Sequence, residues 1–248
     1  MQSNAPPTIF AERRRAAVAA RAATRADPAR YLMDEIADDC VERIGFMQLQ
    51  AARVLVLCDI AGVLSDAVRT ALPDARCVAP GPVREDRPLD FGPFDLIVAG
   101  PAFATVNDLP GALINLHGAL NPGGVFLASF PGAGSLTQLR GIVLEAEPER
   151  PTARMHPLID RSASAALLQR AGFTRQVVDS HSVTVRYGAL ATLVSDLRDQ
   201  GLQSVLADTP PPLTPTTWRA AQSNFAALAD DDGKLTERFE LLTLTGWR

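Results

Sequence analysis

Several features that would assign a sequence to a particular class of protein are scarce or missing here. There are only three cysteines, and no two of them form the close pair that structural zinc sites and redox motifs require. We therefore interpret Cys40, Cys58 and Cys77 as reduced packing residues. No apolar run approaches the roughly 18 to 20 residues that span a bilayer. This predicts a soluble protein of the cytoplasm, or of the mitochondrial matrix if the chain is organellar.

The sequence also lacks an excess of positive charge. Its formal net charge is −4 and its pI is near 5.4, so no overall field attracts phosphates, and we predict no nucleic-acid partner. Arginine is nevertheless concentrated in residues 1–33, a composition that organellar transit peptides share. Because alanine and arginine are strong helix formers and no apolar signal core is present, we favour a helix at the start of the folded protein.

Recognisable catalytic motifs are absent as well. There is no Gly-x-Ser-x-Gly elbow, no phosphate-binding Walker loop and no cysteine–histidine nucleophile arrangement. The histidines His117, His156 and His181 are far apart and match no metal-ligand spacing. We therefore predict packing or surface roles for them and no bound metal. Gly132-Ala133-Gly134-Ser135 resembles a phosphate cradle, but we interpret it as the turn that starts the next helix.

What the sequence does contain is the composition of a packed globular protein. Hydrophobic residues make up 47% and charged residues 21% of the 248 residues, which suits one α/β domain with an added helical layer. Leu32, Ile36 and Cys40 recur at helical spacing. We therefore predict a helical segment over residues 1–50 that packs on the core, followed by a single α/β domain over residues 51–248.

Short apolar runs bounded by turns alternate with helical stretches after residue 50. Runs of this kind are typical of buried strands. Strands that alternate with helices of about ten residues or more indicate a parallel sheet with right-handed crossovers. Residues 80–93, between two of the runs, are rich in proline and glycine and predict a loop. The expected strands are Arg53–Cys58, Arg76–Ala79, Phe94–Gly100, Val125–Phe130, Gln176–Tyr187 and Phe239–Thr245.

Three runs in the middle of the chain, Phe94–Val98, Val106–Leu113 and Ala119–Gly124, together resemble the second half of class I S-adenosylmethionine (SAM)-dependent methyltransferases. Four later runs narrow the resemblance, and these are Leu167–Phe173, Val177–Asp179, Leu193–Arg198 and Thr245–Trp247. They look like the branch that contains the biotin-synthesis carrier-protein methyltransferase and the mitochondrial complex I assembly factor 5.

The resemblance implies a fold. Class I methyltransferases have a seven-stranded Rossmann-like sheet, mostly parallel with one antiparallel strand, and helices on both faces. We therefore expect Phe239–Thr245 to be inserted next to Val125–Phe130, with extra helices in the C-terminal part of the chain. Residues 10–50 should be mainly helical and lie over the carboxyl ends of the strands, where doubly wound folds bind ligands.

The cofactor motif of that family is degenerate in this sequence. The family has an acidic residue in the first strand and a glycine-rich turn after it, because SAM approaches backbone that a Cβ would obstruct. By family position the acidic residue falls on Val56, and the first two glycines fall on Cys58 and Ile60. Only Gly62 is kept. The stretch Cys77–Gly81 also lacks the carboxylate that would bind the ribose hydroxyls.

Four residues remain as candidate cofactor contacts by family position, and they are Asp59, Gly62, Pro101 and Phe103. Asp59 could substitute for a missing carboxylate, but we favour a role as the cap of the following helix, the ordinary use of Asp in such a turn. The aromatic pair that the family places after the fourth strand is replaced by Ala104-Thr105. Each lost polar contact costs about 1–3 kcal/mol, so we predict that SAM binds weakly or not at all.

Two functions fit these observations. The first is a methyltransferase-fold protein that acts by binding a protein partner, by resemblance a subunit of a respiratory complex. The alternative is an active SAM-dependent methyltransferase that acts on a small molecule or a carrier-bound acyl group. Hydroxylation of a protein arginine is a third function, implied by the resemblance alone, and the sequence shows no iron-binding facial triad.

Overall fold

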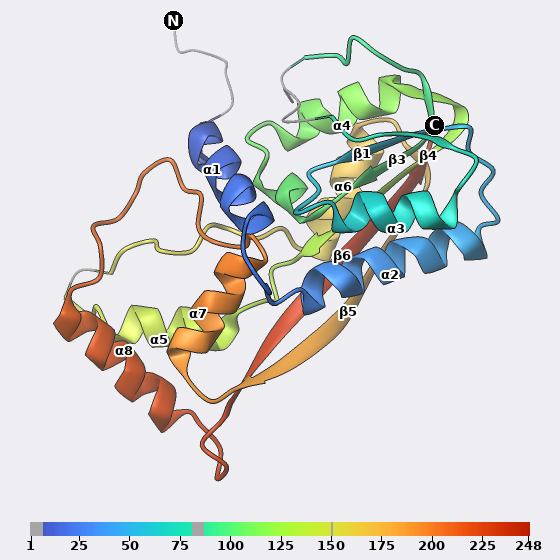
Figure 1. Cartoon of the computed structure of the whole chain (residues 1–248). Helices are drawn as coiled ribbons and strands as arrows, with labels where there is room; N and C mark the ends of the chain where they lie inside the picture. The colour runs from blue at the N-terminus through green and yellow to red at the C-terminus, as the bar shows by residue number, and fades with distance from the viewer. Residues whose placement is uncertain (1–6, 81–86, 150) are drawn as a thin grey trace, which may run out of the picture.

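Six strands form one mixed sheet in the computed structural model, which describes residues 7–80, 87–149 and 151–248. The strand order is β2-β1-β3-β4-β6-β5, in which β1 to β4 are parallel and β6 is antiparallel to both of its neighbours (Figure 1). The strands are β1 Arg53–Leu57, β2 Arg76–Val78, β3 Phe94–Ala99, β4 Leu120–Pro131, β5 Thr174–Tyr187 and β6 Leu235–Trp247.

The predicted place of the last strand is confirmed. β6 lies between β4 and β5, and its residues from Leu241 to Thr245 pair with Pro131 to Leu127 of β4. β1 lies inside the sheet, between β2 and β3. The mostly parallel sheet with one antiparallel strand is therefore the arrangement that the resemblance implied.

The prediction of seven strands was wrong, because six are found and β2 forms one edge of the sheet among the described residues. β2 and β3 are joined by residues 79–93, a segment with prolines at positions 80, 82, 88 and 93. Proline cannot donate a hydrogen bond to a sheet ladder. A parallel neighbour also needs a crossover of about a dozen residues or more. The composition and length of this connection therefore disfavour a further strand between β2 and β3.

Alternate residues of the strands build a separate hydrophobic core on each face of the sheet. Val54 and Val56 of β1 point into the first core, and Leu55 and Leu57 point into the second. Helices α2, α3, α5, α7 and α8 supply residues to the first core, and α4 and α6 to the second. Figure 1 shows these two sets on either side of the sheet, so helices on both faces are confirmed.

The helices differ in length from 9 to 16 residues. No helix in the described ranges is long and apolar enough to cross a membrane. Their bounds are α1 Glu12–Ala23, α2 Tyr31–Phe46, α3 Val63–Ala71, α4 Leu109–Gly118, α5 Thr137–Glu145, α6 Arg161–Arg170, α7 Leu190–Asp199 and α8 Pro215–Ala227, with a short 3-10 helix η1 at Pro101–Thr105.

Helix α2 packs on a face of the sheet. Its buried residues Leu32, Ile36 and Cys40 join the same core as β1. The prediction that residues 10–50 lie over the carboxyl ends of the strands was therefore wrong for α2. A continuous apolar stripe along a helix matches the flat face of a sheet better than its edge. Helix α1 does lie at the carboxyl ends of the strands, as predicted. The division of the chain into two parts at residue 50 stays a prediction.

Polar contacts also link α2 to β5 and β6. Arg43 donates to the carboxylate of Asp39 at 3.0 Å and to that of Asp179 on β5 at 2.7 Å. These carboxylates raise the pKa of the Arg43 guanidinium, although burial opposes them. Asp39 in turn accepts a 2.7 Å hydrogen bond from the Thr243 hydroxyl of β6. The helix is thus linked to both strands of the β5–β6 pair.

Replacing Ile36 with alanine should lower the free energy of unfolding by about 2–5 kcal/mol, because the side chain is 1% exposed between α2 and the sheet. Phe46→Ala on the same helix is the matched control. Its side chain is 89% exposed, so the change should stay within about 0.5 kcal/mol. Urea denaturation measures both variants. Equally small effects would show that α2 is not part of the core.

Candidate functional site

Two adjoining cavities lie at the carboxyl edge of the parallel strands. The first, here called the β1 cavity, has a volume of about 510 Å³. Its walls come from the ends of β1 and β2, from η1 and α4, and from the inner side of α1. The strand order changes direction between β1 and β3, and doubly wound folds bind ligands at such a switch point. The β1 cavity is therefore the place where a cofactor would be expected.

Asp59 lies in the turn after β1 and caps α3. Its carboxylate accepts hydrogen bonds from the backbone N–H groups of Leu64 at 3.1 Å and Ser65 at 2.9 Å, and from the Ser65 hydroxyl. The helix begins after Gly62, whose φ of 80° is the left-handed conformation that favours glycine. The predicted capping role of Asp59 is confirmed. Both carboxylate oxygens are engaged by the protein itself.

Side chains occupy the positions where the family has an acidic residue and two glycines. Val56 is 1% exposed and Ile60 3%, and both belong to the core that α2 covers. Cys58 lines the β1 cavity with a φ of 53°. Its backbone is close to β3, because a Cβ added at Gly100 would lie 2.7 Å from the Cys58 carbonyl oxygen. The turn is therefore packed tightly against its neighbours.

The four candidate cofactor residues do not all meet. Asp59, Gly62 and Phe103 line the β1 cavity, whereas Pro101 lines the second cavity. Phe103 is 2% exposed, and its ring centroid lies 5.7 Å from that of Phe126 on β4. It therefore packs in the core and presents little surface to a ligand.

Three arginines in the wall of the β1 cavity were not predicted as site residues, and they are Arg15, Arg69 and Arg87. Glu12 and Asp59 are the acidic residues among the described part of the same wall. Arg69 is paired with Asp66 at 3.0 Å, and Arg15 donates to the hydroxyl of Thr105 at 3.1 Å. Their positions follow from how α1 and the loops fold over the sheet edge, which no local sequence pattern reveals.

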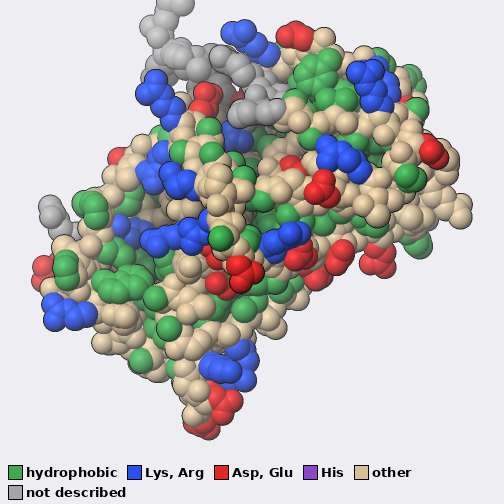
Figure 2. Space-filling view, viewed as in Figure 1, with side chains coloured by type: hydrophobic (Ala, Val, Ile, Leu, Met, Phe, Trp, Pro, Cys, Tyr) green, Lys and Arg blue, Asp and Glu red, His purple; other side chains and the backbone are tan. Residues whose placement is uncertain are grey.

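The second cavity, here called the arginine cavity, has a volume of about 660 Å³. It lies between α1, α5, α7 and α8, and Arg15, Ala19 and Ala102 line both cavities. Arg14, Arg154 and Arg198 also reach its wall. Figure 2 shows basic side chains gathered around the hollow between α1 and α7. No Asp or Glu is among the described residues that line this cavity.

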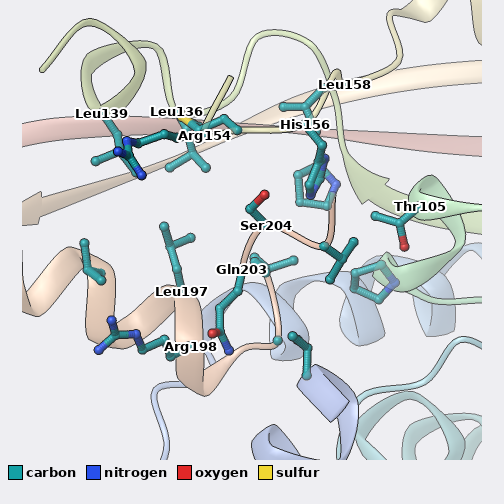
Figure 3. Close-up of a pocket in the computed structure, with 18 of the residues that line it drawn as sticks. Thr105, Leu136, Leu139, Arg154, His156, Leu158, Leu197, Arg198, Gln203 and Ser204 are labelled. Carbon is teal, nitrogen blue, oxygen red and sulfur yellow. The ribbon is translucent and has the colours of Figure 1, made fainter. Parts of the chain in front are cut away.

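His156 lines the arginine cavity and packs against the N-terminal segment. Its ring meets that of Phe10 edge to face, with centroids 5.5 Å apart. Burial lowers its pKa, and the nearby charge of Arg140 acts in the same direction. Figure 3 places His156 and Thr105 toward one end of the cavity and Arg154 and Arg198 toward the other. The described residues contain no cluster of three or more His, Cys, Asp or Glu that could hold a metal ion.

If Asp59 caps α3, its removal should lower the stability of the protein. Asp59→Ala should lower the free energy of unfolding by about 1–2 kcal/mol without any ligand, because α3 loses the acceptor of its first N–H groups. Asp66→Ala, on the same helix, removes a side chain that is 79% exposed and paired only at the surface, so it should cost less than about 1 kcal/mol. Thermal and urea unfolding compare the two. An Asp59 variant as stable as the parent would contradict the capping role.

The chain is similar to two groups of curated proteins, and no known protein-family profile matches it. The mitochondrial arginine-hydroxylase NDUFAF5 of Mus musculus is 29% identical over 189 residues, which are 75% of this chain and 54% of that protein. A malonyl-[acyl-carrier protein] O-methyltransferase of Coxiella burnetii is 28% identical over 60% of this chain and 51% of that protein. The chain thus spans about half the length of these curated relatives.

The fold is also found among solved structures. A structure from Bacillus halodurans assigned to the methyltransferases superposes with a TM-score of 0.55 at 12% identity. The match covers 84% of this chain and 98% of that one. At this identity the likeness shows the fold alone.

Proposed function

We propose that this chain, which has the methyltransferase fold and is similar to the arginine-hydroxylase and carrier-protein methyltransferase relatives, uses that fold as a binding scaffold. In this proposal it binds SAM weakly or not at all and acts through a protein partner. The observation that carries the proposal is the turn after β1, where the protein itself occupies the contacts that a cofactor would need.

Hydrogen bonding supports the proposal first. A bound ribose needs a carboxylate acceptor, and unpaired polar groups of a buried ligand cost about 1–3 kcal/mol each. Asp59 gives both of its oxygens to α3, and Glu12 on α1 is exposed. The end of β2 contributes Ala79 and Pro80 to the cavity wall, and neither side chain is an acceptor. The described residues of the β1 cavity therefore offer a poor fit to the ribose of SAM.

Packing supports the proposal independently. The side chain of Cys58 stands in the cavity wall where the family has glycine. Val56 and Ile60 are buried in the core, so restoring an aspartate or a glycine there would damage the fold. Loss of a buried isoleucine side chain leaves a cavity, and a buried unpaired carboxylate is more costly still. The turn has become a structural element of this protein.

Charge acts in the same direction. SAM carries a sulfonium and an ammonium group besides its carboxylate, and the described residues in the wall of the β1 cavity include three arginines against two acidic residues. Like charges inside a partly enclosed site repel more strongly than in water. An active methyltransferase that acts on a small molecule or a carrier-bound acyl group is the alternative, and it would need SAM to overcome all three obstacles.

The partner in this proposal is a subunit of a respiratory complex, which rests on the resemblance to the assembly-factor branch. The compartment follows that partner, which places the protein in the cytoplasm or, in an organelle, in the mitochondrial matrix. Affinity capture of the tagged chain, with quantitative mass spectrometry against an untagged control, should enrich such a subunit. Enrichment of acyl-carrier protein without any respiratory subunit would favour the alternative.

Isothermal titration calorimetry tests the loss of the cofactor. SAM and S-adenosylhomocysteine should each bind with a Kd above about 100 μM, which corresponds to a binding free energy weaker than about −5.5 kcal/mol. Micromolar binding, or either compound retained on the purified protein, would overturn the proposal and favour the active methyltransferase.

Two variants of the turn after β1 separate the effect of the Cys58 side chain from the effect of the whole altered motif. Cys58→Gly relieves the positive φ of this residue and removes its side chain from the cavity wall, so it should fold and should bind SAM at most about tenfold more tightly, a gain of about 1.4 kcal/mol. The triple change of Val56→Asp, Cys58→Gly and Ile60→Gly should instead unfold at a lower temperature than the parent. A stable triple variant with micromolar affinity for SAM would show that the lost motif was the only obstacle.

A further inference from the structure

We propose that the arginine cavity is a binding site for an amphipathic anion, that is, an alkyl chain that ends in a carboxylate or a phosphate. Nothing in this proposal requires SAM to bind or methyl transfer to occur. It rests on the size of the cavity, its apolar walls and the charges at its rim.

Most of the cavity wall is apolar. Side chains from α1, α5, α7, α8 and β6 meet there, among them Val18, Leu139, Val194, Leu197, Trp218 and Phe239. A volume of about 660 Å³ falls within the roughly 300–1,000 Å³ of ordinary small-molecule sites, which are mostly apolar with a few placed polar groups. Such walls favour a hydrocarbon body, because removing apolar surface from water stabilises the complex.

The charges of the wall have one sign. Arg14 on α1 donates to the Thr209 hydroxyl and to the Ser204 carbonyl oxygen, and neither acceptor is charged. Arg198, in the last turn of α7, is exposed and has no partner among the described residues. Arg154 differs, because Glu147 holds it in a pair at 2.6 Å. Arg14 and Arg198 therefore place uncompensated positive charge beside an apolar space.

This arrangement selects against cations. An arginine side chain of a protein substrate would meet the positive charges of Arg14 and Arg198 with no acidic residue in the described wall to receive it. Like charges in a partly desolvated site are costly, whereas a carboxylate or phosphate gains charge-assisted hydrogen bonds from a guanidinium. The chemistry of the cavity is thus complementary to an anion with an apolar tail.

Intrinsic fluorescence offers a direct test, because Trp218 lines the cavity. The other tryptophan, Trp247, pairs with Val125 of β4 and lies under Arg175, so Trp247→Phe leaves Trp218 as the reporter. Dodecanoate and dodecyl phosphate, each below its micelle concentration, should change the Trp218 emission saturably, and the tighter of the two identifies the head group. Dodecanol, neutral, and dodecylammonium, cationic, are the chain-matched controls and should bind at least about tenfold more weakly.

Two arginine variants test the charge. Arg198→Ala should raise the Kd of the anion about fivefold, the range of a largely exposed ion pair. Arg170→Ala is the matched control, because Arg170 is an exposed arginine in the last turn of α6 and is not in the wall. It should leave the Kd unchanged.

Ala191→Phe, which places a ring in the cavity from the exposed side of α7, should abolish the signal while the melting temperature stays near that of the parent.

The outcomes separate this inference from the proposed function. Equal binding of dodecanol and dodecanoate, tighter binding of dodecylammonium, or equal effects of Arg198→Ala and Arg170→Ala would each overturn the anion site. None of these results depends on the affinity for SAM that calorimetry measures. Micromolar SAM binding would overturn the proposed function and leave the anion site standing.

Discussion

The insertion of β6 between β4 and β5 is the interaction on which the rest of this structure depends. It brings the last residues of the chain into the middle of the sheet, where they serve several elements at once. Glu237 accepts hydrogen bonds from the backbone N–H groups of Leu139 and Gln138 and so caps α5. Its pKa is raised because the carboxyl is buried. Phe239 lines the arginine cavity, and Thr243 holds Asp39 of α2.

The turn after β1 is part of the fold as well as of the cavity wall. Asp59 accepts hydrogen bonds from the backbone N–H groups of Leu64 and Ser65 in α3 with its two carboxylate oxygens. Ile60 fills space between β1 and the loop after α7, since a Cβ added at Gly201 would lie 3.0 Å from its Cδ1. Val56 and Ile60 both belong to the core that α2 covers.

The curated relatives are similar to this chain over about half of their own length. NDUFAF5 of Mus musculus, named for arginine hydroxylation, is 29% identical over 189 residues, 54% of its length. A site for an arginine side chain would need acidic residues, and the described wall of the arginine cavity has none. The fold therefore positions a cavity in the usual place, while the side chains decide what it accepts. Here they combine apolar walls with Arg14 and Arg198.

The sequence by itself determined the α/β class, the six observed strands along the chain and the capping role of Asp59. These follow from apolar periodicity and turn chemistry, which act over a few residues. The place of β6 beside β4 was implied by the family resemblance. Tertiary structure alone decided that α2 covers a sheet face and that Pro101 lines a different cavity from Asp59, Gly62 and Phe103. It also brought Arg14, Arg154 and Arg198 together from α1, a loop and α7. Residues so distant in the chain become neighbours only when the sheet and its helices pack. A pattern of a few residues carries no information about such long-range contacts.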